Sequence, residues 1–356
     1  MAAVDYKREL KDLVEVVVSE NGSDLHFSVG SHPMVRVAGS LIPLVKKPIL
    51  TDQDLEGFAQ VLMAKKKFEE YTKNFEADFS YAHADGVRFR GNGFFQSGSM
   101  SVALRLIPNQ IRTIEELGLP PILESFVQRP QGFFLCVGPV GQGKSTTLAA
   151  MVEYINQNRA EHIVTIEDPV EYIYDAKKSL IDQREIGVDS VSFERALNSA
   201  FRQDVDVILV GEMRNSETIA TAVTAAETGH LVLSTLHTNN AAQTIDRIID
   251  AFPSGQQDQI RVQLAGSLAG IFSQRLIPRI SGGLIPAYEL LINNSAVSNL
   301  IREGRSHEIQ TLIETGLELG MIDMNRSLAE LVKHGEITVE NAFAYSINPK
   351  GLERLM

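Results

Sequence analysis

The chain has 356 residues, of which 44% are hydrophobic and 22% are charged. These values are typical of a globular protein long enough for two domains, and they exclude a fibrous or disordered chain. Lys and Arg number 33 against 45 Asp and Glu, which gives a formal net charge of -12. Because an acidic protein repels phosphate backbones, nucleic acid is not an expected partner.

Cysteine content and hydropathy favour the cytoplasm. The one cysteine, Cys136, forms neither an intrachain disulfide nor a cysteine-based zinc site, as is typical of a reducing compartment. No apolar stretch reaches the roughly 18 residues of a membrane span. The first residues also lack the basic and apolar regions of a signal peptide. We therefore expect a cytoplasmic protein without a membrane span.

Residues 1–106 predict a small α+β domain. Apolar residues at helical spacing favour one helix around residues 10–17 and a second after Thr51–Asp54, which resembles a capping box. Alternating polar and apolar residues predict strands, with a turn at Gly39–Ser40. The strand-like runs are residues 24–29, 34–44, 77–83, 87–96 and 100–106. The last three follow one another closely and predict a meander.

A linker is expected at residues 107–119, where the periodicity lapses, and a second domain at 120–356. In this domain apolar runs alternate with helical patterns, which predicts an α/β fold with a parallel sheet buried on both faces. The runs are residues 133–137, 162–166, 205–210 and 231–236. Each is followed by glycine, acidic or histidine residues, and the carboxyl ends of parallel strands meet at one ligand-binding edge. Several helices are expected from about 295 to 356.

The segment 138–145 matches the phosphate-binding pattern G-x-x-x-x-G-K-[ST] between a predicted strand and a predicted helix. Its glycines allow backbone N–H groups to surround phosphates at a helix N-terminus. Lys144 is expected to neutralise the β- and γ-phosphates, and the Ser145 hydroxyl to ligate Mg²⁺. We therefore predict ATP and Mg²⁺ as ligands. The expected binding residues are Gly138, Pro139, Val140, Gly141, Gln142, Gly143, Lys144, Ser145 and Thr146.

Two acidic residues follow predicted strands. Glu212 comes after Gly211, which stands where many P-loop proteins carry Asp, and is a candidate to orient or deprotonate the attacking water. The alternative is a solvated acid after a buried strand. Glu167 ends the run 162–166 and can reach a metal-bound water, unless it only braces its loop. Ser145, Glu167 and Glu212 are therefore the predicted metal contacts.

Histidines and arginines supply further candidates. His230 and His237 flank one predicted strand and are expected either to contact the γ-phosphate or to be structural. Strand alternation places Arg88 and Arg90 on the same face, and Arg105 follows one hairpin later. These arginines form either a solvated basic face or an anion contact, for example an arginine finger delivered to the ATP of a neighbouring subunit.

In combination these segments resemble the secretion-traffic ATPase family, most closely its type IV pilus retraction subgroup. The segments are residues 23–26, 33–39, 138–145, 165–172, 202–212 and 229–239, with 299–303 and 313–321 further on. The resemblance implies a PAS-like N-terminal domain and a RecA-like ATPase domain with C-terminal helices. It also implies a homohexamer at the inner-membrane base of the pilus machine that acts on a platform protein. In such a ring Arg88, Arg90 and Arg105 correspond to arginines offered to nucleotide.

Three alternatives remain open at this point. A pilus-extension or type II secretion ATPase belongs to the same family, but such relatives tend to be longer and to carry a four-cysteine metal site. A weakly hydrolysing accessory ring would bind ATP beside a second motor. A P-loop kinase would transfer phosphate to an acceptor. Turnover and product analysis separate the last two from a mechanical ATPase.

Overall fold

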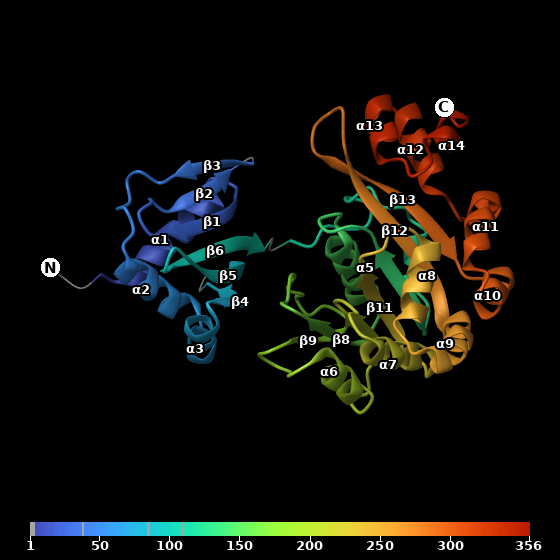
Figure 1. The fold of residues 1–356 in the computed structure, drawn as a ribbon, viewed down its shortest axis with the longest axis horizontal. Coiled ribbons are helices and arrows are strands. Elements are labelled where there is room, and N and C mark those ends of the chain that lie inside the picture. The colour runs from blue at the N-terminus through green and yellow to red at the C-terminus, as the bar shows by residue number, and fades with distance from the viewer. Residues whose placement is uncertain (1–3, 38, 84–85, 108–109) are drawn as a thin grey trace. The chain divides into compact units, whose positions relative to one another are not determined.

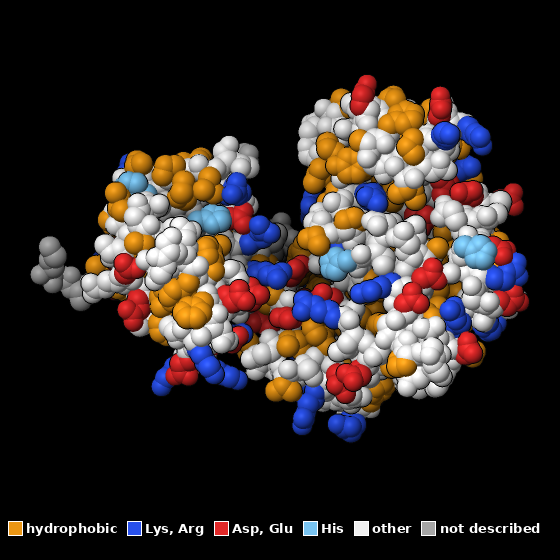
Figure 2. All heavy atoms as spheres, in the orientation of Figure 1, with side chains coloured by type: hydrophobic (Ala, Val, Ile, Leu, Met, Phe, Trp, Pro, Cys, Tyr) orange, Lys and Arg blue, Asp and Glu red, His pale blue; other side chains and the backbone are white. Residues whose placement is uncertain are grey.

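The computed structural model describes residues 4–37, 39–83, 86–107 and 110–356. The chain forms two compact units (Figure 1). The first comprises Met1–Gln110 together with the short segment Pro169–Ile173, and the second comprises Ile111–Asp168 and Tyr174–Met356. Residues 108 and 109 of the expected linker lie outside the described part. In the view of Figure 2, acidic and basic side chains are intermixed on the visible face of each unit.

The first unit contains one six-stranded sheet with the order β3-β2-β1-β6-β5-β4, in which all neighbours are antiparallel. The strands are β1 (Gly22–Ser28), β2 (Met34–Val37), β3 (Ser40–Pro43), β4 (Glu76–Ala82), β5 (Arg88–Gln96) and β6 (Ser99–Ile107). The helices are α1 (Tyr6–Ser19), α2 (Asp52–Leu62) and α3 (Lys65–Asn74). The expected meander and both expected helices are present. The largely polar α3 was not predicted, because Tyr71 is its one buried residue.

Strand alternation divides this sheet into an apolar and a polar face. Leu25, Phe89 and Leu104 are fully buried in one apolar cluster that includes residues of α1 and α2. The neighbouring positions along the same strands point the other way: Asp24 lies opposite Arg105, which lies opposite Arg90. The apolar core therefore fixes which face carries the charged side chains.

The second unit contains a seven-stranded sheet with the order β13-β12-β7-β11-β10-β8-β9. Its neighbours are parallel except for the antiparallel pair β12 and β13. The strands are β7 (Gly132–Val137), β8 (His162–Glu167), β9 (Leu180–Glu185), β10 (Val207–Val210), β11 (Leu231–Leu236), β12 (Leu268–Pro278) and β13 (Leu284–Ile292). The four predicted strands are confirmed as β7, β8, β10 and β11. The sequence reasoning missed β9, β12 and β13.

Helices cover this sheet and form its C-terminal extension. They are α4 (Leu123–Val127), α5 (Lys144–Asn158), α6 (Phe193–Ala200), α7 (Ser216–Glu227), α8 (Ala241–Asp250), α9 (Ser254–Ser267), α10 (Ser295–Arg302), α11 (Ile309–Thr315), α12 (Met324–Lys333), α13 (Val339–Tyr345) and α14 (Pro349–Glu353), with two 3-10 turns at Ser306–Glu308 and Leu317–Leu319. Asn215, Asn240 and Asn294 cap the amino ends of α7, α8 and α10 by accepting a backbone N–H. No helix in the described ranges has the length and apolar character needed to cross a membrane.

The two faces of β7 enter different layers of the core. Phe133, Leu135 and Val137 pack in one cluster with residues of α6, α7, α8 and α9. Phe134 points the other way and packs against Phe126 of α4, with 4.8 Å between ring centroids and an interplanar angle of 48°. A strand that is buried on both faces has no polar surface of its own, so ligand contacts fall to the loops at its ends.

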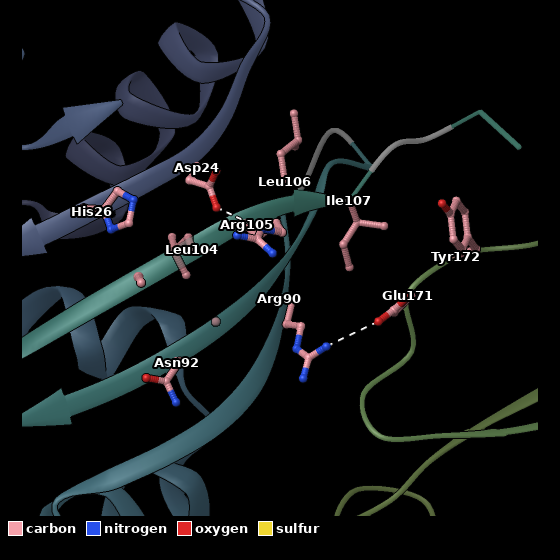
Figure 3. Close-up of a pocket in the computed structure, with 12 residues that line it drawn as sticks. Asp24, His26, Arg90, Asn92, Leu104, Arg105, Leu106, Ile107, Glu171 and Tyr172 are labelled. Carbon is pink, nitrogen blue, oxygen red and sulfur yellow. Dashed lines mark hydrogen bonds and ion pairs between the residues drawn. The ribbon is translucent and has the colours of Figure 1, made fainter. Parts of the chain in front are cut away.

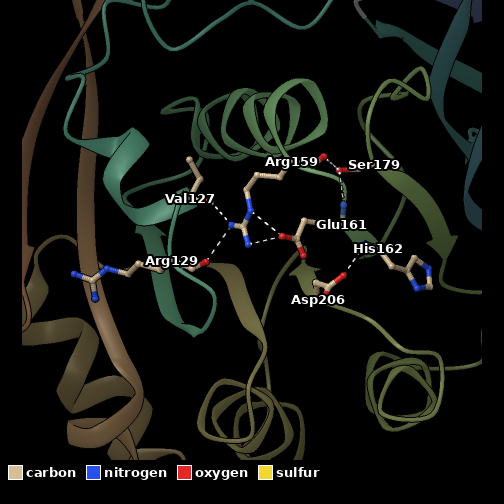
Figure 4. Close-up of polar contacts among 7 residues, drawn as sticks. All are labelled: Val127, Arg129, Arg159, Glu161, His162, Ser179 and Asp206. Atoms are coloured by element: carbon tan, nitrogen blue, oxygen red, sulfur yellow. Dashed lines mark hydrogen bonds and ion pairs between the residues drawn. The ribbon is translucent and has the colours of Figure 1, made fainter.

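Arg159 braces the edge of the sheet where the parallel strands begin (Figure 4). Its guanidinium donates to the Val127 and Arg129 carbonyls and to the Glu161 carboxylate, at 2.8 Å from Nη2 to Oε1. The next residue, His162, donates its backbone N–H to Asp206 at 2.8 Å. These bonds tie α4, the end of α5 and the starts of β8 and β10 together.

Candidate nucleotide site

Four neighbouring strands deliver the predicted phosphate-site segments to one edge of the sheet. The P-loop (residues 138–145) follows β7, His237 follows β11 and Glu212 comes shortly after β10. Glu167 is the last residue of β8, and the four strands are neighbours in the order β7, β11, β10 and β8. Since adjacent strands lie about 4.8 Å apart, β10 and β7 are separated by about 10 Å. The P-loop and Glu212 therefore follow strands about 10 Å apart, with β11 and His237 between them.

The P-loop backbone requires glycine at two positions where β12 approaches it. Gly138 has φ 147° and Gly143 has φ 78°, a region that L side chains rarely adopt. A Cβ atom on Gly138 would lie 2.4 Å from the Gln274 carbonyl oxygen, and one on Gly143 would lie 2.9 Å from Nε2 of Gln274. α5 begins at Lys144, so the N–H groups of its first turn point toward the loop.

Lys144 is buried, with 7% of its surface exposed. Its Nζ donates to the carbonyls of Gly138 and Pro139, both at 2.8 Å, and to Nδ1 of His237 at 3.2 Å. These bonds keep the ammonium group inside the loop instead of in solvent. The side chain thereby supplies a fixed positive charge where the P-loop pattern places β- and γ-phosphates.

Gln274 of β12 holds the P-loop and was not predicted from the sequence. Its Nε2 donates to the Gln142 carbonyl at 2.8 Å, and its Oε1 accepts from the Thr147 hydroxyl at 2.6 Å. Gln142 in turn accepts the Leu276 backbone N–H with Oε1 at 2.7 Å. The loop is thus attached to β12 at three points. Neither Gln142, a free position of the motif, nor Gln274 carries a sequence signal for this contact.

His237 lies beside the P-loop lysine. Partial burial lowers its pKa, and the Lys144 cation lowers it further, so the ring is neutral at pH 7. Because an ammonium group only donates, Nδ1 accepts the Lys144 hydrogen bond and the ring proton resides on Nε2. His237 therefore presents an N–H donor at Nε2.

His230 lies at the opposite end of the same strand. It precedes β11, and a six-residue strand spans about 20 Å. Its Nδ1 lies 3.0 Å from the Ala225 carbonyl oxygen, and its ring meets Phe201 edge to face at 5.5 Å. The structure therefore does not bring His230 to the P-loop of its own chain, because β11 carries it to the other edge of the sheet.

Gly211 permits the close approach of the ends of β10 and β8. Its N–H donates to the Ile166 carbonyl at 2.8 Å, and a Cβ atom would lie 3.4 Å from the Glu167 Cα. The following residue, Glu212, is paired through its carboxylate with the Arg214 guanidinium. The two acidic residues of the site are therefore held on adjacent strand ends, as predicted.

Glu167 and Glu212 have different environments. Glu167 is 8% exposed and accepts the Thr165 hydroxyl with Oε1 at 2.6 Å. The Glu212 side chain is 22% exposed. With the Ser145 hydroxyl they form a set of oxygen donors, which suits a hard cation such as Mg²⁺. The described residues contain no cluster of three or more His, Cys, Asp or Glu that holds a metal alone. Phosphate oxygens and water would have to complete such a site.

The first unit carries its own pocket of about 420 Å³ on the charged face of the sheet (Figure 3). Arg105 donates from Nε to Asp24 at 2.9 Å, and Arg90 donates from Nη1 to Glu171 at 3.3 Å. Burial raises the pKa of Asp24, but the hydrogen bonds from Ser23 and Arg105 outweigh it, so the pKa lies below its usual value. Asp24 is therefore anionic at neutral pH.

Arg88, Arg90 and Arg105 project from the same face, as strand alternation predicts. Arg90 and Arg105 are directly opposite in the ladder, and Arg88 lies two residues along β5. The Arg88 Nε atom is buried and has no hydrogen-bond partner among the residues that the structure describes. The Arg90 and Arg105 side chains are 43% and 74% exposed. The face therefore presents three cations, two of them held by carboxylates.

Comparison with known proteins gives matches over nearly the whole chain. The family model for type II/IV secretion system proteins matches residues 5–319. The type IV pilus retraction ATPase PilT of Pseudomonas aeruginosa is 42% identical over 334 residues, 94% of this chain and 97% of its own length. A twitching motility protein of Neisseria gonorrhoeae is 44% identical over 87% of this chain and 83% of its own length. A crystal structure of the pilus retraction motor PilT with bound ADP superposes with a TM-score of 0.90 at 44% identity, covering 96% of this chain and 98% of that one.

Proposed function

The chain belongs to the family of type II/IV secretion system proteins, and from this premise we propose that it is an ATP-hydrolysing motor that powers retraction of type IV pili. The family resemblance expected from the sequence is confirmed. The observation that carries the proposal is the end-to-end match to a retraction ATPase, which includes both units of the fold. The alignment of four site segments along one sheet edge supports nucleotide chemistry at that edge.

Each site residue has a proposed role in hydrolysis. The P-loop amides and Lys144 bind the phosphates, and Glu212 orients and deprotonates the attacking water. Ser145 and Glu167 would hold Mg²⁺, which when bound would supply positive charge against the phosphates. His237 donates from Nε2 to the γ-phosphate. The donor at Nε2 and the fixed position of the lysine support these assignments.

We further propose a homohexamer located in the cytoplasm at the inner-membrane base of the pilus machine, where it acts on a platform protein. In this ring Arg88, Arg90 and Arg105 contact nucleotide bound by a neighbouring subunit. Their common face in the first unit supports this role. The carboxylates of Asp24 and Glu171 keep two of the side chains in place until phosphate competes for them.

The alternatives differ in what the motor does to pili. An extension motor would assemble pilin, and a secretion motor would act on another filament. An accessory ring would bind ATP with little turnover. The presence of Lys144, Ser145, Glu167 and Glu212 favours a hydrolysing ring over an accessory one.

The first test counts surface pili and scores surface motility in the source organism without this gene. The strain is complemented with the wild type, with Lys144→Ala, or with the exposed-site control Lys178→Ala. A retraction motor predicts excess pili and lost motility, rescued by the wild type and the control but not by Lys144→Ala. Cells without pili would indicate an extension motor. Unchanged pili and motility would contradict both.

A further inference from the structure

Glu289 is a carboxyl group buried between two apolar clusters on β13. It is 1% exposed, and its neighbours on the same face are Ala287 and Leu291. Ala287 belongs to the cluster that includes α12, and Leu291 to the main core. A buried carboxyl group lowers the stability of the fold unless it forms hydrogen bonds. The contacts of Glu289 must therefore be identified.

One carboxylate oxygen of Glu289 binds the start of α8. Oε1 accepts the Ala241 N–H at 2.9 Å, and Ala241 is the first residue of that helix. The other oxygen, Oε2, is buried without a hydrogen bond to any described residue, as is the Ser273 hydroxyl directly opposite in the ladder. Glu289 therefore directs one of its bonds at a helix N-terminus, where a negative charge is favourable.

The bonded helix starts four residues after His237. The segment between them is held at a second point by Arg275, which donates from Nη2 to Asn239 at 3.3 Å. Gln274, the neighbour of Arg275 on β12, holds the P-loop. Both loops of the nucleotide site are thus attached to the β12–β13 hairpin.

We propose that Glu289 is a positioning residue for ATP hydrolysis: its carboxylate fixes the amino end of α8 and so holds His237 beside Lys144. The inference rests on the proposed role of His237 at the phosphate. The ionised carboxylate holds the helix more strongly than the neutral acid, because its hydrogen bond is charge-assisted and its negative charge interacts favourably with the positive end of the helix dipole.

The surroundings of Glu289 place its titration in the physiological range. Burial raises its pKa to about 7 against the lowering effects of the Ala241 amide and of a hydrogen bond with Gln310, and the nearby Asp323 and Glu314 also raise it. The other charged groups on elements packed against β13 are Arg275 on β12, which binds Asn239, Asp246, Arg247 and Asp250 on α8, and Arg326, Glu330 and Lys333 on α12. Protonation of Glu289 is therefore expected to loosen the start of α8.

The test compares wild type with Glu289→Gln, which keeps the shape and the acceptor oxygen but removes the charge. In the full-length protein, wild-type kcat for MgATP is expected to rise with pH through about 7. The variant is expected to lack this rise and to have a kcat about three- to fivefold lower above that pH, with KM changed less than about twofold. A variant with the wild-type kcat and pH profile would overturn the proposal.

Glu153→Gln is the matched control. Glu153 is also buried, at 5% exposure, but it is paired with Lys177, and hydrogen bonds from Gln157 and Lys177 hold its pKa below the usual value despite burial. This variant is expected to lose stability without a change in the pH profile of kcat. Equal changes in both variants would mean that Glu289 acts only through stability and would also overturn the proposal.

A second readout does not depend on turnover. In the nucleotide-free protein, NMR titration of the His237 ring is expected to give a pKa closer to the ordinary value in Glu289→Gln than in wild type, because the ring is held less firmly beside Lys144. An identical His237 titration in both proteins would contradict the positioning role. Absence of ATP turnover in wild type would contradict the proposed function and leave this readout to decide the role of Glu289.

Discussion

Lys144 donates a hydrogen bond from Nζ to Nδ1 of His237 at 3.2 Å and so connects the P-loop with the segment that follows β11. The two residues are 93 positions apart, but β7 and β11 are neighbours in the sheet. The bond assigns the ring proton to Nε2. If the Lys144 ammonium group binds a phosphate, the electrostatic environment of the His237 ring therefore changes as well.

The His237 environment predicts that wild-type stability declines in mild acid. Partial burial and the Lys144 cation lower the pKa of His237 in the folded state, so the unfolded chain binds more protons between that pKa and about 6.5. The contribution of this residue to stability therefore falls as pH falls below about 6.5. His237→Gln is expected to reduce the loss. Thermal unfolding on both sides of that pH measures it, and equal acid sensitivity in both proteins would contradict it.

The His162 environment predicts the opposite pH dependence of stability, a contribution that is lost as pH rises. Burial lowers its pKa, but the Asp182 carboxylate and the carbonyls of Asp204 and Gln203 raise it net. The folded state then binds the extra proton, so the contribution is fully present below about pH 6.5 and is lost as pH rises through the folded pKa. His162→Gln is expected to lower the unfolding temperature more in mild acid than above neutrality. A loss independent of pH would show that the ring is uncharged in the fold.

The Glu212 assignment predicts a variant that binds ATP without hydrolysing it. Glu212→Gln is expected to lower kcat about 100-fold or more while nucleotide affinity stays within a few fold. Arg214→Ala is the control, because the Arg214 side chain is 72% exposed and its ion pair contributes at most about 1 kcal/mol. Turnover in this control should stay within a few fold of wild type. Near-normal turnover in Glu212→Gln would remove the general-base role.

The contacts of Gln274 predict that replacing this residue lowers both the stability of the fold and the affinity for nucleotide. Gln274→Leu leaves the buried Thr147 hydroxyl and the Gln142 carbonyl without their partner, which is expected to cost about 1–3 kcal/mol. Thr147→Val measures the coupling in a double-mutant cycle by chemical unfolding. The partly exposed Gln263, which binds only Glu227 through its side chain among the described residues, is the control, and Gln263→Leu should change stability by about 0.5 kcal/mol or less. If the losses of stability in Gln274→Leu and Thr147→Val are additive, the hydrogen bond between these two side chains does not stabilise the fold.

The sequence was sufficient to predict that these segments meet at one edge of the sheet, because the motif is contiguous and the rule for parallel strands brings the other segments to it. Glu167, Glu212 and His237 each follow an apolar run, so their common edge could be predicted without a structure. His230 lies at the other edge of the sheet because it precedes β11, whereas His237 follows it.

The parts that were missed depend on tertiary contacts. β12 contains the polar run Ser273-Gln274-Arg275, which interrupts the apolar pattern expected of a buried strand. Gln274 binds the P-loop and Arg275 binds the segment after β11, and local periodicity cannot predict either contact. Similarly, the inclusion of Pro169–Ile173 in the first unit follows from packing around Arg90 and Glu171.

The arginine face predicts activity that is shared between subunits. Arg88→Ala is expected to impair turnover of the assembled ring about 10³-fold, the range of arginine fingers, while isolated subunits still bind nucleotide. The buried Nε of Arg88 lacks a hydrogen bond among the described residues, so its removal breaks no bond at that atom. Arg36→Ala is the control, because Arg36 lies on β2, three strands from Arg90 on β5, and its ion pair with Asp24 is loose, at 3.8 Å.

Mixing inactive variants then separates a trans-acting arginine from one that acts within its own chain. Arg88→Ala subunits retain Glu212, and Glu212→Gln subunits retain Arg88. If the arginine acts across the subunit interface, a mixed ring contains some interfaces with both groups intact. Such a mixture should recover part of the ATPase activity that neither variant has alone. If mixed rings form, as native mass spectrometry can establish, and no activity returns, the arginine does not act in trans.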